Sequence, residues 1–362
     1  MMKALYEFSE EKIVEIIEEN FNHGKITGRL QGSYGDIFLF NFSKIAIKCP
    51  KISRFGSREK IRDGLERAIR EIDNTKKFMR YPGVHRFGPP KLILGWPFFP
   101  SQLRDGTLYD LIKSPTSWDI REKLAAIIQV THTLNYCISM GLNAHQDLKP
   151  ENIFIHKLTR EMFEAKLNLN NILGTTKFTF VADFGIADAF RDIGQNSGSR
   201  PYMAPEQYSG GLLIDGSKID IFALGVIMFM CFSGGIHPIG HLLSDIWPSS
   251  VSKWNKDRSW QIWANQKEKN IHKYIEKFAI PPEICVIIER CLQSDSRDRP
   301  SMLELQGDLY IILQKIHPDW SLALHNQIQQ NFERWASPGE PLDWPYYDEC
   351  ILELKEFYAD MK

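Results

Sequence analysis

AHQDLKPEN, residues 144–152, is the stretch of this 362-residue chain that decides its fold, and ADFG follows it at residues 182–185. The first stretch places Asp147 two residues before a lysine and five residues before an asparagine. The second adds Asp183 before an aromatic residue and a glycine. These side chains can supply a base for a hydroxyl group, a cation for a phosphate and two oxygen ligands for magnesium. The spacing therefore points to chemistry on a phosphate group.

Five further short motifs occur along the chain. They are GSYGDI at 32–37, IAIK at 45–48, SRPYMAPE at 199–206, DIFALGV at 220–226 and DRPSM at 298–302. With HQDLKPEN and DFG, this ordered set resembles the eukaryotic-like Ser/Thr protein kinase family over roughly residues 25–305. The resemblance implies an α+β, two-lobed protein kinase fold, with a small antiparallel β-sheet lobe and a larger, mainly helical lobe. It also implies ATP and Mg²⁺ as cofactors.

The resemblance assigns roles in phosphoryl transfer to four residues of the two central motifs. Asp147 is implied as the catalytic base that accepts the proton of the substrate hydroxyl, and Lys149 as a contact of the γ-phosphate. Asn152 and Asp183 are implied as the Mg²⁺ ligands, because both carry hard oxygen donors. A lysine at position 149 resembles the Ser/Thr class, so Ser and Thr hydroxyls of proteins are the expected acceptors.

The glycine-rich stretch is expected to lie close to the phosphates of ATP. Gly32 and Gly35 would let the backbone of a hairpin approach the nucleotide, since a Cβ atom would obstruct it. The first glycine of the family pattern is replaced here by Leu30, which weakens the motif. An ordinary hairpin turn is the alternative interpretation of these glycines.

Lys48 is expected to hold the α- and β-phosphates, and it needs a carboxylate partner. It lies in an apolar strand, where an uncompensated charge is costly. Glu71 is the predicted partner, because its helical pattern leads on to YPGV at residues 81–84 as it does in the family. Glu66 is the alternative, and a solvated helix face is the other interpretation of either glutamate.

Five residues of the motifs are expected to be structural. The resemblance implies a buried ion pair between Glu206 and Arg299, and backbone N–H groups of the catalytic loop donated to Asp220. His145 and Phe184 are implied as part of an apolar column between the lobes.

The segment from Asp183 to Glu206 offers few sites for control by phosphorylation. Gln146 replaces the arginine of the family, which usually helps to bind a phosphate on this segment. Ser199 is expected to hydrogen-bond within the site, so Ser197 is the remaining switch candidate. Arg191 or Arg200 could replace the missing cation. The sequence therefore predicts weak dependence of activity on a phosphate here.

Two other functions are alternatives to that of a protein kinase. A pseudokinase or scaffold module could share the fold, but Lys48, Asp147, Asn152 and Asp183 are all present. A kinase for small molecules is the second alternative, and the APE segment argues for protein substrates instead. Transfer of phosphate to a protein acceptor would separate the three.

Composition excludes several other classes of protein. The formal net charge is −1, so no overall field favours nucleic acid or an anionic membrane. Six cysteines without a C-x-x-C spacing indicate reduced thiols rather than a disulfide framework. The first 20 residues lack an apolar core, and the longest apolar run, Ile221–Phe232, is too short to span a bilayer. We therefore expect a cytoplasmic protein without a membrane partner.

Four segments are expected along the chain: an N-terminal helical extension (1–24), the small lobe (25–103), the large lobe (104–315) and an aromatic-rich C-terminal extension (316–362). In the first, Ser9 is a candidate N-cap, and the apolar residues behind it predict a helix that packs on the small lobe. A partner-binding helix is the alternative. Further helices are predicted at 57–80 and 120–140, and a strand at 92–99.

Two segments differ from the family pattern. One is longer than usual, and the other is rich in aromatic residues. Residues 156–176 lie within an enlarged connection between two predicted strands, interpreted as a hairpin loop or, alternatively, as a docking site. The C-terminal extension contains Trp320, Trp335, Trp344, Tyr346, Tyr347 and Phe357. Such aromatic density predicts packing on the large lobe rather than a free tail. A surface for a binding partner is the alternative.

Overall fold

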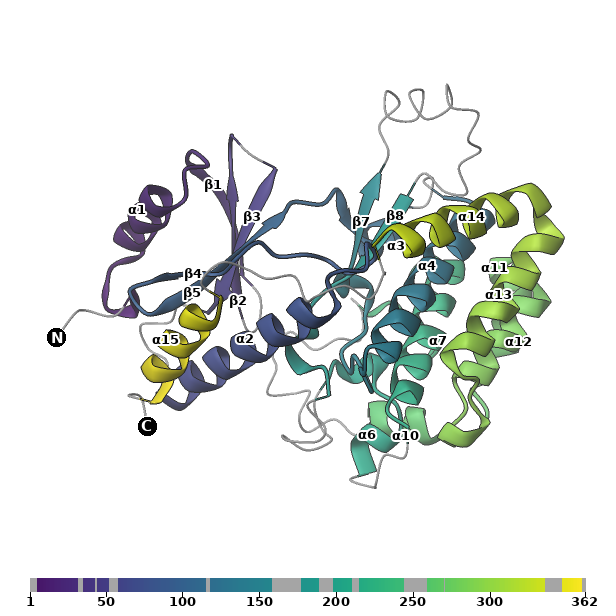
Figure 1. The fold of residues 1–362 in the computed structure, drawn as a ribbon. Helices are drawn as coiled ribbons and strands as arrows, with labels where there is room; N and C mark the ends of the chain where they lie inside the picture. Colours follow the sequence, from purple (N-terminus) through teal and green to yellow (C-terminus); the bar gives the residue numbers. More distant parts are fainter. Residues whose placement is uncertain are drawn as a thin grey trace. The chain divides into compact units, whose positions relative to one another are not determined.

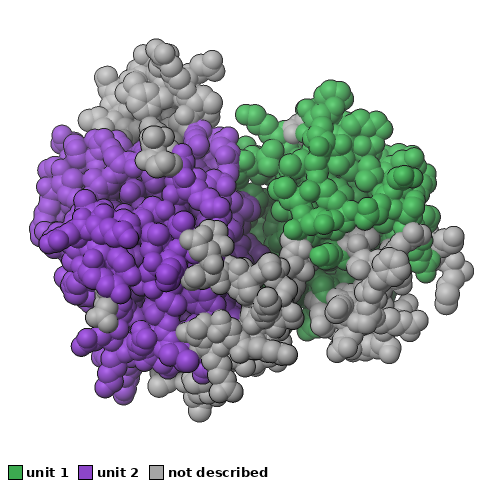
Figure 2. Space-filling view, turned by 180° about the vertical axis from the view of Figure 1, so that it is seen from behind, with its two compact units in different colours: residues 1–80, 85–104, 338–362 green, residues 81–84, 105–337 purple. Residues whose placement is uncertain are grey.

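The structure is a computed structural model of the chain, and the residues it describes are 5–31, 35–42, 44–51, 58–114, 118–157, 177–188, 198–209, 215–243, 259–269, 271–335 and 347–359. The chain divides into two compact units, coloured in Figure 2. Unit 1 comprises residues 1–80, 85–104 and 338–362, and unit 2 comprises residues 81–84 and 105–337.

Unit 1 is built on an antiparallel sheet of five strands, in the order β1-β2-β3-β5-β4 (Figure 1). The strands are β1 (Ile26–Gln31), β2 (Gly35–Phe40), β3 (Ile45–Pro50), β4 (Lys91–Ile93) and β5 (Trp96–Gln102). In β2 every second residue is buried, including Phe38 and Phe40, as expected for a strand with one face on a core. The small antiparallel lobe predicted from the sequence is therefore confirmed.

The single strand predicted over residues 92–99 is wrong, because this segment is a tight hairpin. Strands β4 and β5 pair through Ile93 and Trp96, and the two residues between them are Leu94 and Gly95. Both have positive φ, 51° and 76° respectively, which is the conformation that two-residue hairpin turns require. The apolar Leu94 concealed the turn, since leucine rarely adopts this conformation.

Two helices of unit 1 match the predicted ones. Helix α1 (Glu10–Asn20) begins at Ser9, whose hydroxyl accepts a hydrogen bond from the backbone N–H of Lys12 at 3.3 Å. Its residues Ile13 and Ile17 are buried within the unit. Helix α2 (Arg58–Phe78) buries Leu65, Ala68 and Ile72, a spacing of three to four residues that forms one apolar face.

The C-terminal extension does not pack on the larger unit alone, which corrects the prediction for its last part. Helix α14 (Pro318–Trp335) packs on helices of unit 2, with Leu324 and Ile328 buried. Helix α15 (Tyr347–Ala359) instead lies beside α2 and β4 of unit 1 (Figure 1), where Ile351 and Leu354 are buried. Apolar content predicts that a segment is buried, but it does not say against which surface.

Unit 2 is mainly helical and also holds a small antiparallel sheet of β6 (Gly106–Thr107), β7 (Ile153–Lys157) and β8 (Lys177–Val181). Its helices, besides α14, are α3 (Leu108–Lys113), α4 (Ile120–Ser139), α6 (Glu206–Ser209), α7 (Ser217–Ser233), α10 (Ser259–Asn265), α11 (Ile275–Phe278), α12 (Pro282–Cys291) and α13 (Met302–Ile316). Helix α7 is apolar on all sides and buried from Ile219 to Ser233, so it forms the centre of the core. The larger, mainly helical lobe is thus confirmed as well.

Residues 158–176, which make up most of the predicted 156–176 insertion, lie outside the described residues. In the part of the chain that the structure describes, we find no helix with the length and apolar character needed to cross a bilayer.

Candidate active site

The backbone of the AHQDLKPEN loop is held by a buried carboxylate at the start of α7. Asp220 accepts hydrogen bonds from the backbone N–H of His145 at 2.7 Å and of Gln146 at 3.0 Å. Burial raises the pKa of Asp220 to about 6, although His145 and these two N–H donors favour the ionised form. The predicted structural role of Asp220 is confirmed.

Asp147 lies at the centre of the hydrogen bonds that this loop makes. Its Oδ2 atom accepts a hydrogen bond from Lys149 Nζ at 2.9 Å, and its backbone carbonyl accepts one from Asn152 Nδ2, also at 2.9 Å. Lys149 Nζ also donates to the hydroxyl of Ser199 at 2.9 Å. The structure thus brings together three predicted site residues and the serine expected beside them.

The second carboxylate oxygen of Asp147 has a different environment from the first. Oδ1 is buried, and it has no hydrogen-bond partner among the described residues. A buried acceptor without a donor costs free energy, so native proteins usually satisfy such atoms. The hydroxyl group of an incoming substrate is a donor of the kind that this oxygen lacks.

Lys149 keeps its positive charge at neutral pH. Burial lowers its pKa, but the Asp147 carboxylate, the hydrogen bond to it and the charges of Asp183 and Glu151 together raise the pKa above its ordinary value. A protonated lysine beside the carboxylate is therefore available to bind an anionic group.

A backbone hydrogen bond links the segment of Asp183 to Asn152. Asp183 has a left-handed backbone (φ 65°) directly before the 3-10 turn Phe184–Ile186. The N–H of Ala182, its neighbour, donates to the carbonyl of Asn152 at 2.9 Å. His145 is bound to the same segment, with Nε2 at 3.0 Å from the Ala182 carbonyl and its ring 4.9 Å from that of Phe184.

This donor set fits Mg²⁺ as a partial site. Because the side-chain amide of Asn152 donates its N–H to Asp147, its carbonyl oxygen is the atom left for a cation. Within the described ranges, no group of three or more His, Cys, Asp or Glu side chains could hold a metal by itself. Mg²⁺ commonly takes one or two protein oxygens and completes its shell with phosphates and water.

Unit 1 contains the predicted pair of Lys48 and Glu71. Lys48 Nζ lies 2.5 Å from Glu71 Oε1, and the glutamate is buried on α2. Glu66, the alternative partner, is exposed. The cost of leaving a cation unpaired in an apolar strand explains why the carboxylate on the inner face of α2 was the better choice.

We expect Glu71→Gln to lower kcat/KM for ATP by about tenfold, or about 1.4 kcal/mol. The amide cannot balance the Lys48 ammonium, so the lysine loses its fixed position. Steady-state kinetics with varied ATP measure the effect. Glu66→Gln on the exposed part of the same helix is the matched control and should match wild type. Equal losses in the two variants would contradict the pairing.

Gly35 meets a structural requirement in addition to the predicted one. A Cβ atom at this position would lie 2.7 Å from the Cys49 carbonyl oxygen, so the close pairing of β2 with β3 demands a glycine. Gly32, with residues 33 and 34, lies outside the described residues.

The segment that ends in APE is tied to unit 2 by the predicted ion pair. The Arg299 guanidinium donates to both carboxylate oxygens of Glu206, at 2.6 and 2.9 Å. His237, fully buried, lies with Nε2 2.9 Å from the Pro201 carbonyl, and the hydroxyl of Tyr208 donates to the Arg200 carbonyl at 2.7 Å. Burial lowers the pKa of His237 to about 4, so its ring is neutral at neutral pH.

Sequence reasoning missed Asp188, five residues after Asp183. Its carboxylate accepts hydrogen bonds from the backbone N–H of Asn143 at 3.0 Å and of Ala144 at 2.8 Å. A single aspartate after a D-F-G motif has no periodicity or spacing that would distinguish it from a solvated loop residue. Only its position next to the catalytic loop identifies it.

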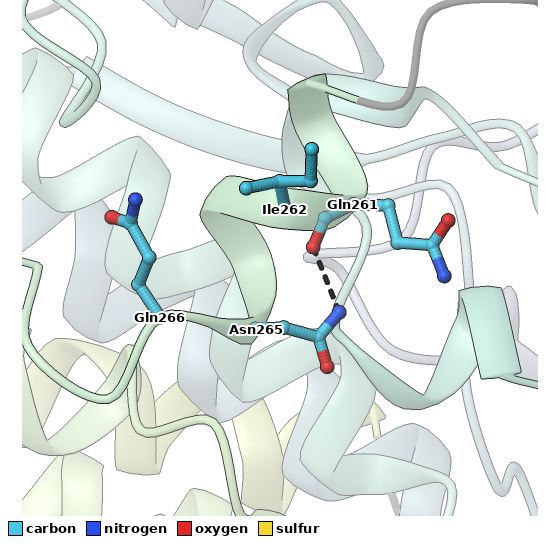
Figure 3. A pocket seen from close by; sticks show the side chains of 4 residues that line it. All are labelled: Gln261, Ile262, Asn265 and Gln266. Carbon is cyan, nitrogen blue, oxygen red and sulfur yellow. Dashed lines mark hydrogen bonds between the residues drawn. The ribbon is translucent and has the colours of Figure 1, made fainter.

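A depression of about 480 Å³ lies over α10, lined by Gln261, Ile262, Asn265 and Gln266 (Figure 3). The Asn265 side chain turns back to donate to the Gln261 carbonyl at 2.7 Å. None of the four residues carries a titratable group, so this depression offers no acid, base or nucleophile.

This chain is similar to a known protein family and to several curated proteins. The family model described as "Protein kinase domain" matches residues 31–311. "Probable serine/threonine-protein kinase SIS8" of Arabidopsis thaliana is 25% identical over 308 residues, covering 82% of this chain and 25% of the relative. "Putative serine/threonine-protein kinase R517/R518" of Acanthamoeba polyphaga mimivirus is 28% identical over 58% of this chain and 48% of the relative. "Mitogen-activated protein kinase kinase 1" of Arabidopsis thaliana is 28% identical over 55% and 49%, respectively.

The chain thus spans between a quarter and about half of the length of these curated relatives. The family model begins at the last residue of β1 and covers strands β2 to β5 of unit 1, the catalytic loop and most of the helices of unit 2. The predicted family resemblance is confirmed, and this chain belongs to the protein kinase family.

Proposed function

We propose that this protein transfers the γ-phosphate of ATP, with Mg²⁺, to Ser and Thr hydroxyls of protein substrates. The single observation that carries the proposal is the environment of Asp147, whose Oδ2 is bound by Lys149 while its buried Oδ1 lacks a partner among the described residues. One carboxylate oxygen is held in place by Lys149, and the other can accept a hydrogen bond from a hydroxyl group. The names of two of the relatives support the Ser/Thr class.

Each step that this chain's residues would perform follows from their contacts. Asp147 Oδ1 accepts the hydrogen bond of the substrate hydroxyl and takes its proton as the new bond to phosphorus forms. Lys149, protonated and bound to both Asp147 and Ser199, stabilises the negative charge of the transferring group. The Ser199 hydroxyl gives the lysine a second hydrogen-bond acceptor and so restricts its position.

The residues of the motifs would hold the cofactors. When bound, Mg·ATP supplies the phosphoryl group, and the metal neutralises part of its charge. Asn152 and Asp183 would hold the metal, and Lys48, oriented by Glu71, would hold the α- and β-phosphates. Gly32 and Gly35 would let the glycine-rich backbone approach the phosphates.

A pseudokinase and a small-molecule kinase are the competing functions. Lys48 with its partner Glu71, and the ordered hydrogen bonds around Asp147, favour an active enzyme over a pseudokinase. The test is transfer of radiolabelled phosphate from ATP by the purified protein to mixed proteins and, separately, to a panel of small alcohols. Protein labelling supports the proposal, labelling of small alcohols alone supports the small-molecule kinase, and no labelling supports the pseudokinase. A cytoplasmic location and a partner at residues 316–362 stay predictions of the sequence.

We expect phosphatase treatment to change the rate on a separate protein substrate by less than about threefold. Gln146 cannot offer the bidentate cation that would make a phosphate at Ser197 strongly ordering. Ser197 and Arg191, the alternative cation, lie outside the described residues, whereas Arg200 lies in a 3-10 turn. Ser197→Ala should give the same result, and heat-inactivated phosphatase is the control.

A loss of about a hundredfold after phosphatase treatment, or about 2.7 kcal/mol in the barrier, would show that phosphorylation governs the enzyme despite Gln146.

A further inference from the structure

Four consecutive backbone N–H groups of the catalytic loop are bound by two carboxylates from different parts of unit 2. Asp220 of α7 takes the N–H groups of residues 145 and 146, and Asp188 takes those of Asn143 and Ala144. A loop has no regular partners for its backbone, so each of these bonds restricts the conformation that places Asp147. The motifs account for Asp220 but not for Asp188.

Asp188 binds the loop through its own backbone as well as through its side chain. Its N–H donates to the carbonyl of Ala144 at 3.0 Å, while its Oδ1 accepts from the N–H of the same residue at 2.8 Å. The side-chain amide of Asn143 lies 3.3 Å from the other carboxylate oxygen. Asp188 adopts a left-handed conformation (φ 57°), which aspartate and asparagine accept more readily than other residues with a Cβ.

The position of Asp188 in the chain gives these bonds a consequence for the chemistry. The segment from Asp183 to Asp188 passes through the 3-10 turn of Phe184 to Ile186. Fixing both ends of this segment against the catalytic loop fixes Asp183 relative to Asp147. The Asp183 end is held by Ala182, whose N–H is bound to Asn152.

We propose that Asp188 is a positioning residue whose carboxylate fastens the Asp183 segment to the catalytic loop. Because this carboxylate is part of the side chain, no added phosphate is needed to make the contact. The proposal rests on the proposed function for its catalytic consequence, but the contacts themselves do not. It also gives a reason for Gln146: a loop already held by two carboxylates has no need of an arginine that captures a phosphate. The negative charge of Asp188 would repel a phosphate rather than bind it.

Two substitutions distinguish the role of the side-chain acceptor oxygen from that of the left-handed backbone conformation. Asp188→Gly tolerates the left-handed conformation but removes every side-chain acceptor. Asp188→Asn tolerates it too, and its amide oxygen can replace Oδ1, which accepts both backbone N–H groups. A residue needed only for the turn would make the two variants alike.

We expect Asp188→Gly to lower kcat about thirtyfold, or about 2 kcal/mol, and Asp188→Asn to stay within about threefold of wild type. The Mg²⁺ concentration for half-maximal rate should rise in the glycine variant, since Asp183 is no longer held, while its thermal midpoint stays close to that of the asparagine variant. Asp295→Asn, at an exposed carboxylate that accepts the N–H of Arg297 at 3.0 Å, is the matched control.

Hydrogen exchange of the 142–146 peptide tests the contact without reference to activity. The amides of Asn143 and Ala144 should exchange faster in Asp188→Gly than in Asp188→Asn or wild type. Equal exchange in all three, or equal kcat in the two variants, would overturn the proposal. If wild type transfers no phosphate, the proposed function fails, and the exchange comparison still decides whether Asp188 holds the loop.

Discussion

Asp147→Asn is expected to lower kcat by about a thousandfold or more, with the fold and the affinity for ATP retained. General base catalysis by a positioned side chain contributes 10²–10⁴-fold, and Asp147 also holds Lys149, so we expect the upper part of that range. Asparagine has the size of aspartate but cannot take a proton. Its amide must also place an N–H₂ group either against the donors Lys149 and Asn152 or toward the substrate hydroxyl.

Single-turnover phosphotransfer from radiolabelled ATP measures this loss separately from product release. Asp215→Asn is the matched control, because its carboxylate accepts hydrogen bonds from Ser217 at the start of α7 and lies outside the catalytic loop. Near-wild-type turnover of Asp147→Asn in the same assay would remove Asp147 as the catalytic base. An unchanged thermal midpoint shows that the loss does not come from unfolding.

The second large effect is on stability, where we expect Arg299→Met to cost about 3–5 kcal/mol. The guanidinium is buried, at 2% exposure, and donates to both oxygens of Glu206 and to backbone carbonyls that include those of Gln293 and Lys218. Methionine can fill the space but removes all of these hydrogen bonds. Breaking a buried pair on one side strands the charge on the other, which costs more than the pair itself contributes.

Thermal and urea unfolding measure the change, and two variants make it specific. Arg297→Met, two residues earlier, removes an exposed ion pair with Asp295 and should leave the midpoint nearly unchanged. The double variant Glu206→Met with Arg299→Met should recover part of the loss, because no carboxylate is then stranded. A midpoint for Arg299→Met close to that of Arg297→Met would contradict the role given to this pair.

Much of the candidate site could be predicted because its chemistry depends on residues close together in the sequence. Asp147, Lys149 and Asn152 lie within six positions, and the loop that carries them holds its own hydrogen bonds. Helix α7 could be predicted from an apolar run of 12 residues, which has no stable place except a core.

Long-range pairs were predictable from a physical requirement combined with the family resemblance, or from the resemblance alone. A cation in an apolar strand needs a carboxylate, and Glu71 was predicted because its helical pattern leads on to YPGV as in the family. The pairing of Arg299 with Glu206, 93 positions apart, came from the family resemblance and not from any local pattern.

The order and kind of the chemical groups and the helical patterns of α1, α2 and α4 were determined by the sequence alone, because these depend on neighbours along the chain. The two lobes were implied by the family resemblance. The tertiary structure decided which surface α15 covers, that Leu94 and Gly95 form a turn, and that Asp188 binds the loop of Asp147. Each of these depends on contacts between distant segments. An aspartate, a leucine or an apolar helix is compatible with several environments, and only packing in three dimensions selects one of them.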